Sequence, residues 1–233
     1  MITQDDWSAI LLTLKLATVV TLLLTIVATP LAWWLARTHS RWRPVVSAIV
    51  ALPLVLPPTV IGFYLLLAFS PNSAFAKMLG WIGLERVAFS FEGLVIGSLV
   101  YSLPFVVQPL QNSMAAIESE LLEAAASLGA SAWDRFRQIV VPLSIPGYVI
   151  GATLGFAHTI GEFGIVLMIG GNIPEETRLV SIAIYDHAEG LNFASAHRLS
   201  AIMLGVSFVT LLVVFVWQAR SRTNVSRLPE QIL

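Results

Sequence analysis

The chain has 233 residues, of which 57% are apolar and only 12% are charged. Soluble chains carry about 25% charged residues, so this composition excludes an ordinary soluble domain. The absence of cysteine excludes disulfides, a thiolate nucleophile and a Cys-ligated zinc site, and a net charge of −1 with 13 basic residues argues against nucleic-acid binding.

Uncharged stretches of at least 21 residues recur along the chain, at 16–36, 44–76, 93–117, 138–161 and 199–219. About 20 apolar residues in a helix cross the ~30 Å hydrocarbon core of a bilayer. We therefore expect an all-α polytopic membrane protein with one transmembrane domain over 1–233. Its five spans are expected at about 12–36, 45–69, 93–114, 139–161 and 199–219, with a loop at about 115–138. The first span follows Asp5 and Asp6 rather than a basic leader, so it is expected to be retained.

Basic residues predict the topology, because cytoplasmic loops are rich in Lys and Arg. They gather between spans one and two, between spans three and four, and after span five: Arg37, Arg41, Arg43, Arg135, Arg137, Arg220, Arg222 and Arg227. Placing these segments in the cytoplasm puts the N-terminus outside and the C-terminus inside. The inner segments then sum to +3 and the outer segments to −4.

Prolines interrupt the first three spans, at Pro30, Pro53, Pro57, Pro58, Pro104 and Pro109. Each interior proline removes a backbone hydrogen bond and kinks a helix. The pattern favours helices that move or line a cavity, and a static, kinked bundle is the alternative. After span four, the apolar run Phe163–Ile169 is too short to span. It either extends span four or re-enters the membrane.

The loop at 115–138 is the most highly charged part of the chain. Its apolar residues Ile117, Leu121, Leu122, Ala125 and Leu128 fall close to one helical face. Gly129 suits the left-handed position after a helix, and Ser131 with Asp134 forms a capping-box pattern for a second short helix. Trp133 and Phe136 suit either a partner's groove or the membrane interface.

This loop resembles the EAA loop of ABC importer permeases. The matching residues are Glu123, Ala124, Ala125, Gly129, Ile139 and Pro142, and Val141 stands where the family usually has Leu. The resemblance implies a type I permease fold, in which this loop docks into a cytoplasmic ATPase subunit. Glu123, Ala124 and Ala125 would face that ATPase, and Gly129 would make the turn.

Two further segments resemble molybdate ABC transporter permeases: Leu52–Leu67, and Gly161–Gly164 together with Asn172–Arg178. Sulfate permeases share parts of both, so sulfate or tungstate remains an alternative substrate to molybdate. The resemblance implies a homodimer in the cell inner membrane, two ATPase subunits and an extracytoplasmic oxyanion-binding protein. That delivery partner would also explain how an anion reaches an acidic outer face.

The chain itself lacks catalytic motifs. A P-loop needs Gly-Lys, but Lys15 and Lys77 follow Leu14 and Ala76, and neither H-E-x-x-H nor G-x-S-x-G occurs. We therefore expect a transport subunit without a cofactor of its own, and ATP would be bound and hydrolysed by a partner subunit.

Glu162 is the acid of greatest interest, because His158 lies four residues earlier on the same helical face. We expect a paired structural carboxylate that helps to hold an outer gate, with Arg178 or Arg198 as its cation. The alternative is a proton-coupled secondary transporter that uses Glu162 and His158. Further pathway or gate candidates, each of which could instead satisfy local backbone groups, are Thr59, Gln108, Asn112, Asn172, Thr177 and Arg178.

Overall fold

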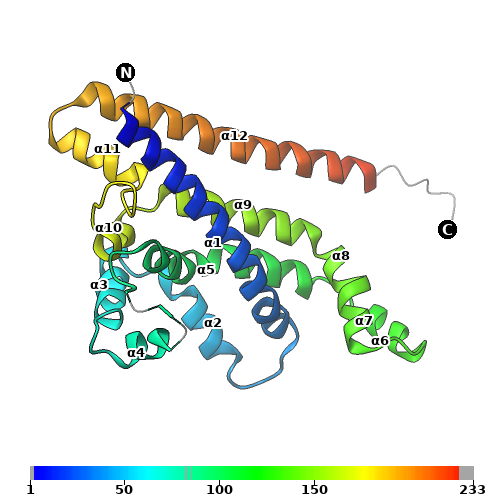
Figure 1. The fold of residues 1–233 in the computed structure, drawn as a ribbon. Coiled ribbons are helices and arrows are strands. Elements are labelled where there is room, and N and C mark those ends of the chain that lie inside the picture. The colour runs from blue at the N-terminus through cyan, green and yellow to red at the C-terminus, as the bar shows by residue number, and fades with distance from the viewer. Residues whose placement is uncertain (1–2, 82, 85, 226–233) are drawn as a thin grey trace.

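The structure is a computed structural model that describes the backbone of residues 3–81, 83–84 and 86–225, and the side chains up to residue 216. The described residues form helices and connecting loops, with no β-strand among them (Figure 1). The long helices are α1 (Gln4–Arg37), α5 (Phe91–Ala115), α9 (Ile145–Gly161) and α12 (Phe193–Val225). The shorter elements are α2 (Arg43–Ala51), η1 (Leu52–Leu54), α3 (Pro58–Ala68), α4 (Ala74–Gly80), α6 (Ser119–Ser127), α7 (Ala132–Arg135), η2 (Phe136–Val140), α8 (Val141–Leu143), α10 (Gly164–Gly170) and α11 (Val180–Glu189).

The core lies where α1, α5 and α9 pack against one another. One face of α1 is fully buried along its length, because its apolar residues recur at close to the helical repeat. The stripe consists of Leu16, Val20, Leu24, Ala28, Ala32 and Leu35. The opposite side of α1 exposes large apolar side chains such as Leu22 and Ile26, as expected of a helix that faces lipid.

In the part of the chain that the structure describes, α1, α5 and α12 are long and apolar enough to cross a membrane, and two bent pairs raise the number to as many as five. The pair α2–η1 and α3 bends by 109°, and the pair α7–α8 and α9 bends by 66°. The expected spans at 45–69 and 139–161 therefore match bent helix pairs rather than straight helices. Proline explains the first bend, since Pro57 is extended and Pro58 opens α3.

The run Phe163–Ile169 becomes the separate helix α10 and does not extend α9. The break falls at Glu162, whose backbone is extended (ψ 133°). Ile165, Val166 and Ile169 are buried, and α10 packs against α3 and α5. A short apolar helix is thus folded back against the bundle.

Glycines allow α9 to approach α5 closely. Gly147, Gly151 and Gly155 recur every fourth residue on the buried side of α9. A Cβ at Gly151 would lie 3.1 Å from the carbonyl oxygen of Val106, and one at Gly147 would lie 2.9 Å from that of Pro109. Small residues at this spacing are typical of helix contacts in membranes.

The ends of α1 and α12 lie on two opposite sides of the helix bundle. The start of α1 lies next to α11, whereas its end lies beside the loop that precedes α6. Figure 1 shows α12 beginning beside α11 and running toward the side where α7 and α8 lie. Both α1 and α12 therefore begin on the side where α11 lies (Figure 1). Of the charges used to predict topology, Glu85, Arg227 and Glu230 lie outside the described residues, as do the side chains of Arg220 and Arg222.

Candidate functional site

Helix α6 projects from the bundle without a buried residue. Glu123 and Ala124 are exposed and Ala125 is half-buried. Part of the apolar face expected for this helix is exposed: Leu121 is 45% and Leu128 is 89% exposed, whereas Leu122 is half-buried against the main core and Ile117, before the helix begins, is buried. An exposed apolar face on a short helix is suited to a partner protein.

The turn after α6 follows the predicted pattern. Gly129 adopts φ +90°, and its N–H donates to the carbonyl of Ala126 (2.9 Å). The capping box at α7 is confirmed, since the backbone N–H of Asp134 donates to Ser131 Oγ (3.1 Å) and Ser131 N donates to Asp134 Oδ2 (3.2 Å). Side-chain and backbone hydrogen bonds from Ser131 hold the pKa of Asp134 below its ordinary value. Asp134 is therefore charged at neutral pH and fixes the start of α7.

Arg37 ties the start of this loop to the end of α1. Its Nη2 donates to the carbonyls of Ile117 (2.6 Å) and Met114 (3.1 Å), and its guanidinium lies 5.2 Å from the ring centre of Trp33. Hydrogen bonds from a charged donor are stronger than neutral ones. The base of the loop is thereby held while α6 is left exposed.

The remaining loop residues lie on the return path to the membrane. Ile139 is half-buried in η2, a π-helical turn, and Pro142 is exposed in α8. The neighbouring Val140 is fully buried in the main core. The return path is thus anchored in the bundle, so a displacement of α6 can be passed to α9.

A groove of about 480 Å³ brings together two of the pathway candidates, Gln108 and Asn112. Both are exposed and lie one helical turn apart on α5. Apolar residues supply most of the lining, among them Leu54, Phe105 and Leu154. Thr59 is exposed at the start of α3 and does not line this groove.

Glu162 is buried at 3% exposure and accepts a hydrogen bond from Ser98 of α5 (Ser98 Oγ to Oε2, 2.9 Å). Its Oε1 is buried and has no hydrogen-bond partner among the described residues. One turn earlier, His158 Nδ1 lies 2.9 Å from Ser102 Oγ. Two polar rungs, Glu162–Ser98 and His158–Ser102, therefore join α9 to α5. Arg178, expected as a cation for Glu162, pairs instead with Asp186.

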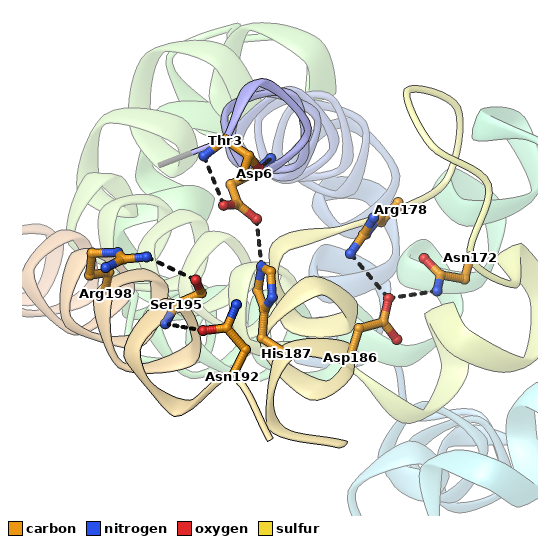
Figure 2. Close-up of polar contacts among 9 residues, drawn as sticks. All are labelled: Thr3, Asp6, Asn172, Arg178, Asp186, His187, Asn192, Ser195 and Arg198. Carbon is orange, nitrogen blue, oxygen red and sulfur yellow. Dashed lines mark hydrogen bonds and ion pairs between the residues drawn. The ribbon is translucent and has the colours of Figure 1, made fainter. Parts of the chain in front are cut away.

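Polar residues on the side where α1 begins fix α11 in place (Figure 2). Asp186 accepts from Arg178 (3.2 Å) and from the amide of Asn172 (2.7 Å). His187 Nε2 lies 2.8 Å from the buried Asp6 of α1. Arg198 donates to Ser195 Oγ at the start of α12.

Thr177 braces the loop before α11. Its hydroxyl donates to the carbonyl of Gly170 (2.6 Å) and accepts from the N–H of Ile173 (3.2 Å). The candidates Asn172, Thr177 and Arg178 thus all satisfy local partners, and the structure separates them from the groove that holds Gln108 and Asn112.

Sequence reasoning did not single out Ser98, Ser102 or Arg37. The two serines repeat every fourth residue on α5, as do Glu162 and His158 on α9, so the matching spacing is a signal that could have paired them. Arg37 carries no such signal, because its closest partners are the main-chain carbonyls of Met114 and Ile117, with Ser119 Oγ at 3.4 Å.

Residues 28–221 match the family model described as "Binding-protein-dependent transport system inner membrane component". The chain is 53% identical to the molybdenum transport system permease protein ModB of Azotobacter vinelandii, over 92% of this chain and 95% of that one. It is 34% identical to ModB of Escherichia coli (strain K12), over 97% and 100%.

A probable sulfate transport system permease protein of Zygnema circumcarinatum is 34% identical, over 87% of this chain and 69% of that one. Among solved structures, a bacterial ABC transporter for alginate import superposes with a TM-score of 0.69 at 22% identity, covering 95% and 80% of the two chains. The MetNI methionine ABC transporter gives 0.69 at 17%, covering 91% and 92%. The chain belongs to the inner-membrane permease components of binding-protein-dependent ABC importers.

Proposed function

We propose that this chain is the permease subunit of an ATP-driven importer that carries molybdate into the cytoplasm by alternating access. The observation that carries the proposal is the exposed helix α6, which presents Glu123, Ala124 and Ala125 on a loop held at both ends by the bundle. The 53% identity to a molybdenum permease supports the choice of substrate.

The proposed partners follow from the two ends of the molecule. At the loop side, α6 would dock into an ATPase subunit that binds and hydrolyses ATP. At the outer side, an oxyanion-binding protein would deliver its cargo. The predicted topology, with the N-terminus outside and the C-terminus in the cytoplasm, belongs to the same proposal.

We further propose a homodimer with two ATPase subunits. The groove beside Gln108 and Asn112 is open along one side of the chain, and two copies around a two-fold axis would enclose a central path. The amide N–H groups of these residues can donate to an oxyanion without binding it tightly, which suits a path that must release its cargo.

The Glu162–Ser98 and His158–Ser102 rungs support a gate role, since they join α5 to α9 near the outer end of α9. Replacing Glu162 with Gln exchanges one acceptor oxygen for an NH₂ group. Either the hydrogen bond from Ser98 is then lost or a buried donor is left without an acceptor, and we expect both arrangements to loosen the rungs. Uptake by the assembled complex is expected to fall several-fold and its basal ATPase rate to rise. Glu189→Gln, an exposed change, is the control. Unchanged uptake and unchanged basal ATPase activity in Glu162→Gln would remove Glu162 from the gate.

The function itself is tested in proteoliposomes that contain this chain, an ATPase subunit and a molybdate-loaded binding protein. We expect molybdate uptake only when ATP is present on the side of the membrane where the ATPase subunit is bound. Uptake should be lost when the ATPase subunit is omitted. Uptake that persists on a proton gradient alone would support the secondary transporter instead.

Sulfate is the second candidate substrate, because a probable sulfate permease is 34% identical over most of this chain. The same vesicles distinguish the substrates when the binding protein is loaded with molybdate, tungstate or sulfate. Equal uptake of all three would place the selectivity in the binding protein.

A further inference from the structure

An aromatic groove lies between α1 and α7, away from the groove assigned to transport. It has a volume of about 450 Å³ and is lined by Thr29, Pro30, Trp33, Ala132, Trp133 and Phe136. Volumes of this size are typical of pockets for small molecules. We refer to these six residues as the α1–α7 groove.

The surface of the α1–α7 groove is apolar. Three of its residues are aromatic, and its single hydroxyl, that of Thr29, donates to the carbonyl of Thr25 (2.6 Å). Pro30 lacks a backbone N–H, so it offers no donor either. The groove therefore suits a hydrocarbon occupant better than a polar one.

The groove lies where the uncharged stretch of α1 ends, beside the loop at 115–138. We call this loop the coupling loop, after its proposed role. Thr29, Pro30 and Trp33 belong to the last three turns of α1, inside its uncharged stretch, and Trp133 belongs to the loop outside that stretch. Tryptophan is enriched at this depth, where one end of a site is apolar and the other is wet. An occupant would span the same boundary.

The aromatic pair on α7 is turned toward α1. Trp133 stacks on Phe136 (ring centres 5.8 Å apart), and Phe136 meets the edge of Trp33 (5.9 Å). The residues of α6, by contrast, are exposed or half-buried. Of the two roles that the sequence left open for Trp133 and Phe136, these contacts favour the membrane interface over a partner's groove.

Arginines adjoin the residues of the groove: the guanidinium of Arg37 lies 5.2 Å from the ring centre of Trp33, and Arg135 and Arg137 flank Phe136 in the chain. Arg37 and Arg135 are committed to the carbonyls of Ile117 and Leu122, whereas Arg137, directly after Phe136, is exposed. The nearby acid, Asp134, is held by Ser131. Of these three arginines, Arg137 is thus the exposed one.

We propose that the α1–α7 groove binds an anionic phospholipid, with an acyl chain against Trp33, Trp133 and Phe136 and the phosphate beside Arg137. Acyl chains match the apolar lining, and the anionic headgroup complements the exposed guanidinium. Because α7 and α1 both form the groove, the bound lipid would brace the coupling loop against the bundle.

The test uses tryptophan fluorescence of the full chain in phosphatidylcholine vesicles. A minor fraction of the lipid carries brominated acyl chains, which quench nearby tryptophan. This brominated lipid is phosphatidylglycerol in one set of vesicles and phosphatidylcholine in the other. We expect stronger quenching by the brominated phosphatidylglycerol. That excess should shrink in Trp133→Phe and remain in Trp42→Phe, a control on an exposed tryptophan beyond the end of α1.

Arg137→Gln tests the headgroup contact. One basic residue near an anionic membrane surface contributes about 1 kcal/mol, so the preference for phosphatidylglycerol should fall about five-fold. Arg41→Gln, which removes the same charge from an exposed position on the same side, should leave the preference unchanged.

Three results would overturn the proposal. The first is equal quenching by the two brominated lipids, and the second is an equal loss of preference in Arg41→Gln and Arg137→Gln, which would indicate general surface attraction. The third is unchanged quenching in Trp133→Phe together with weaker capture of the ATPase subunit by this variant. That result would assign the aromatic pair to the ATPase interface.

Discussion

Replacing Gly129 with proline is expected to lower ATP-coupled uptake about thirty-fold while the chain still inserts and folds. Gly129 adopts φ +90°, and its N–H donates to Ala126 in the turn between α6 and α7. Proline fixes φ near −65° and has no N–H, so the native turn is lost. A conformational cost of about 2 kcal/mol corresponds to roughly a thirty-fold change in the population of the native turn. The measurement is uptake and ATPase activity of the reconstituted complex.

Gly83→Pro is the matched control. Gly83 has φ +85°, its N–H also donates to a residue three positions earlier, and open space surrounds it. It lies after α4, away from the coupling loop. If both proline variants reduced uptake equally, or if Gly129→Pro transported normally, the turn would have no special part in coupling.

Replacing Gly151 with leucine is expected to separate α9 from α5 and to lower the thermal stability of the purified chain. The new Cβ would lie 3.1 Å from the carbonyl oxygen and 3.3 Å from the Cα of Val106, and these backbone atoms cannot turn aside. Overpacking of this kind costs about 1–3 kcal/mol. Uptake should fall with stability, because the Glu162–Ser98 and His158–Ser102 rungs depend on the same helix contact.

Gly205→Leu is the control for that change. Gly205 lies in α12, and nothing lies within 4 Å of a Cβ added there. Its melting temperature in detergent micelles should match that of the wild type. If the melting temperature of Gly151→Leu equalled that of the wild type, α5 and α9 could separate slightly at little cost in stability.

The sequence predicted the coupling loop in detail because its structure is local. A capping box needs two residues three positions apart, and a left-handed turn needs one glycine. Both predictions are confirmed, at Ser131 with Asp134 and at Gly129. The uncharged stretches likewise marked the long helices, since bilayer thickness sets helix length.

Other features depend on how distant segments meet. Pro57 and Pro58 predicted a break in the helix, but the size of the bend, 109°, depends on where α3 packs. The contact between Glu162 and Ser98 joins residues 64 positions apart. The pathway candidates were chosen by chemistry alone, so the sequence could not separate Gln108 and Asn112, which share a groove, from Thr177, which braces a loop. The glycine repeat on α9 was available as a signal for a close helix contact.

The hydrogen bonds from Arg37 to the coupling loop affect which substitutions this protein can tolerate. Its two shorter hydrogen bonds go to the carbonyl oxygens of Met114 and Ile117, which every residue type supplies, and a longer one goes to Ser119 Oγ (3.4 Å). Substitutions at 114 or 117 therefore leave the acceptors in place, and no side-chain change there can compensate for the loss of the guanidinium. Position 37 should show little covariation with 114 and 117 among relatives, and a genetic screen for suppressors of an Arg37 defect should yield second sites elsewhere in the loop.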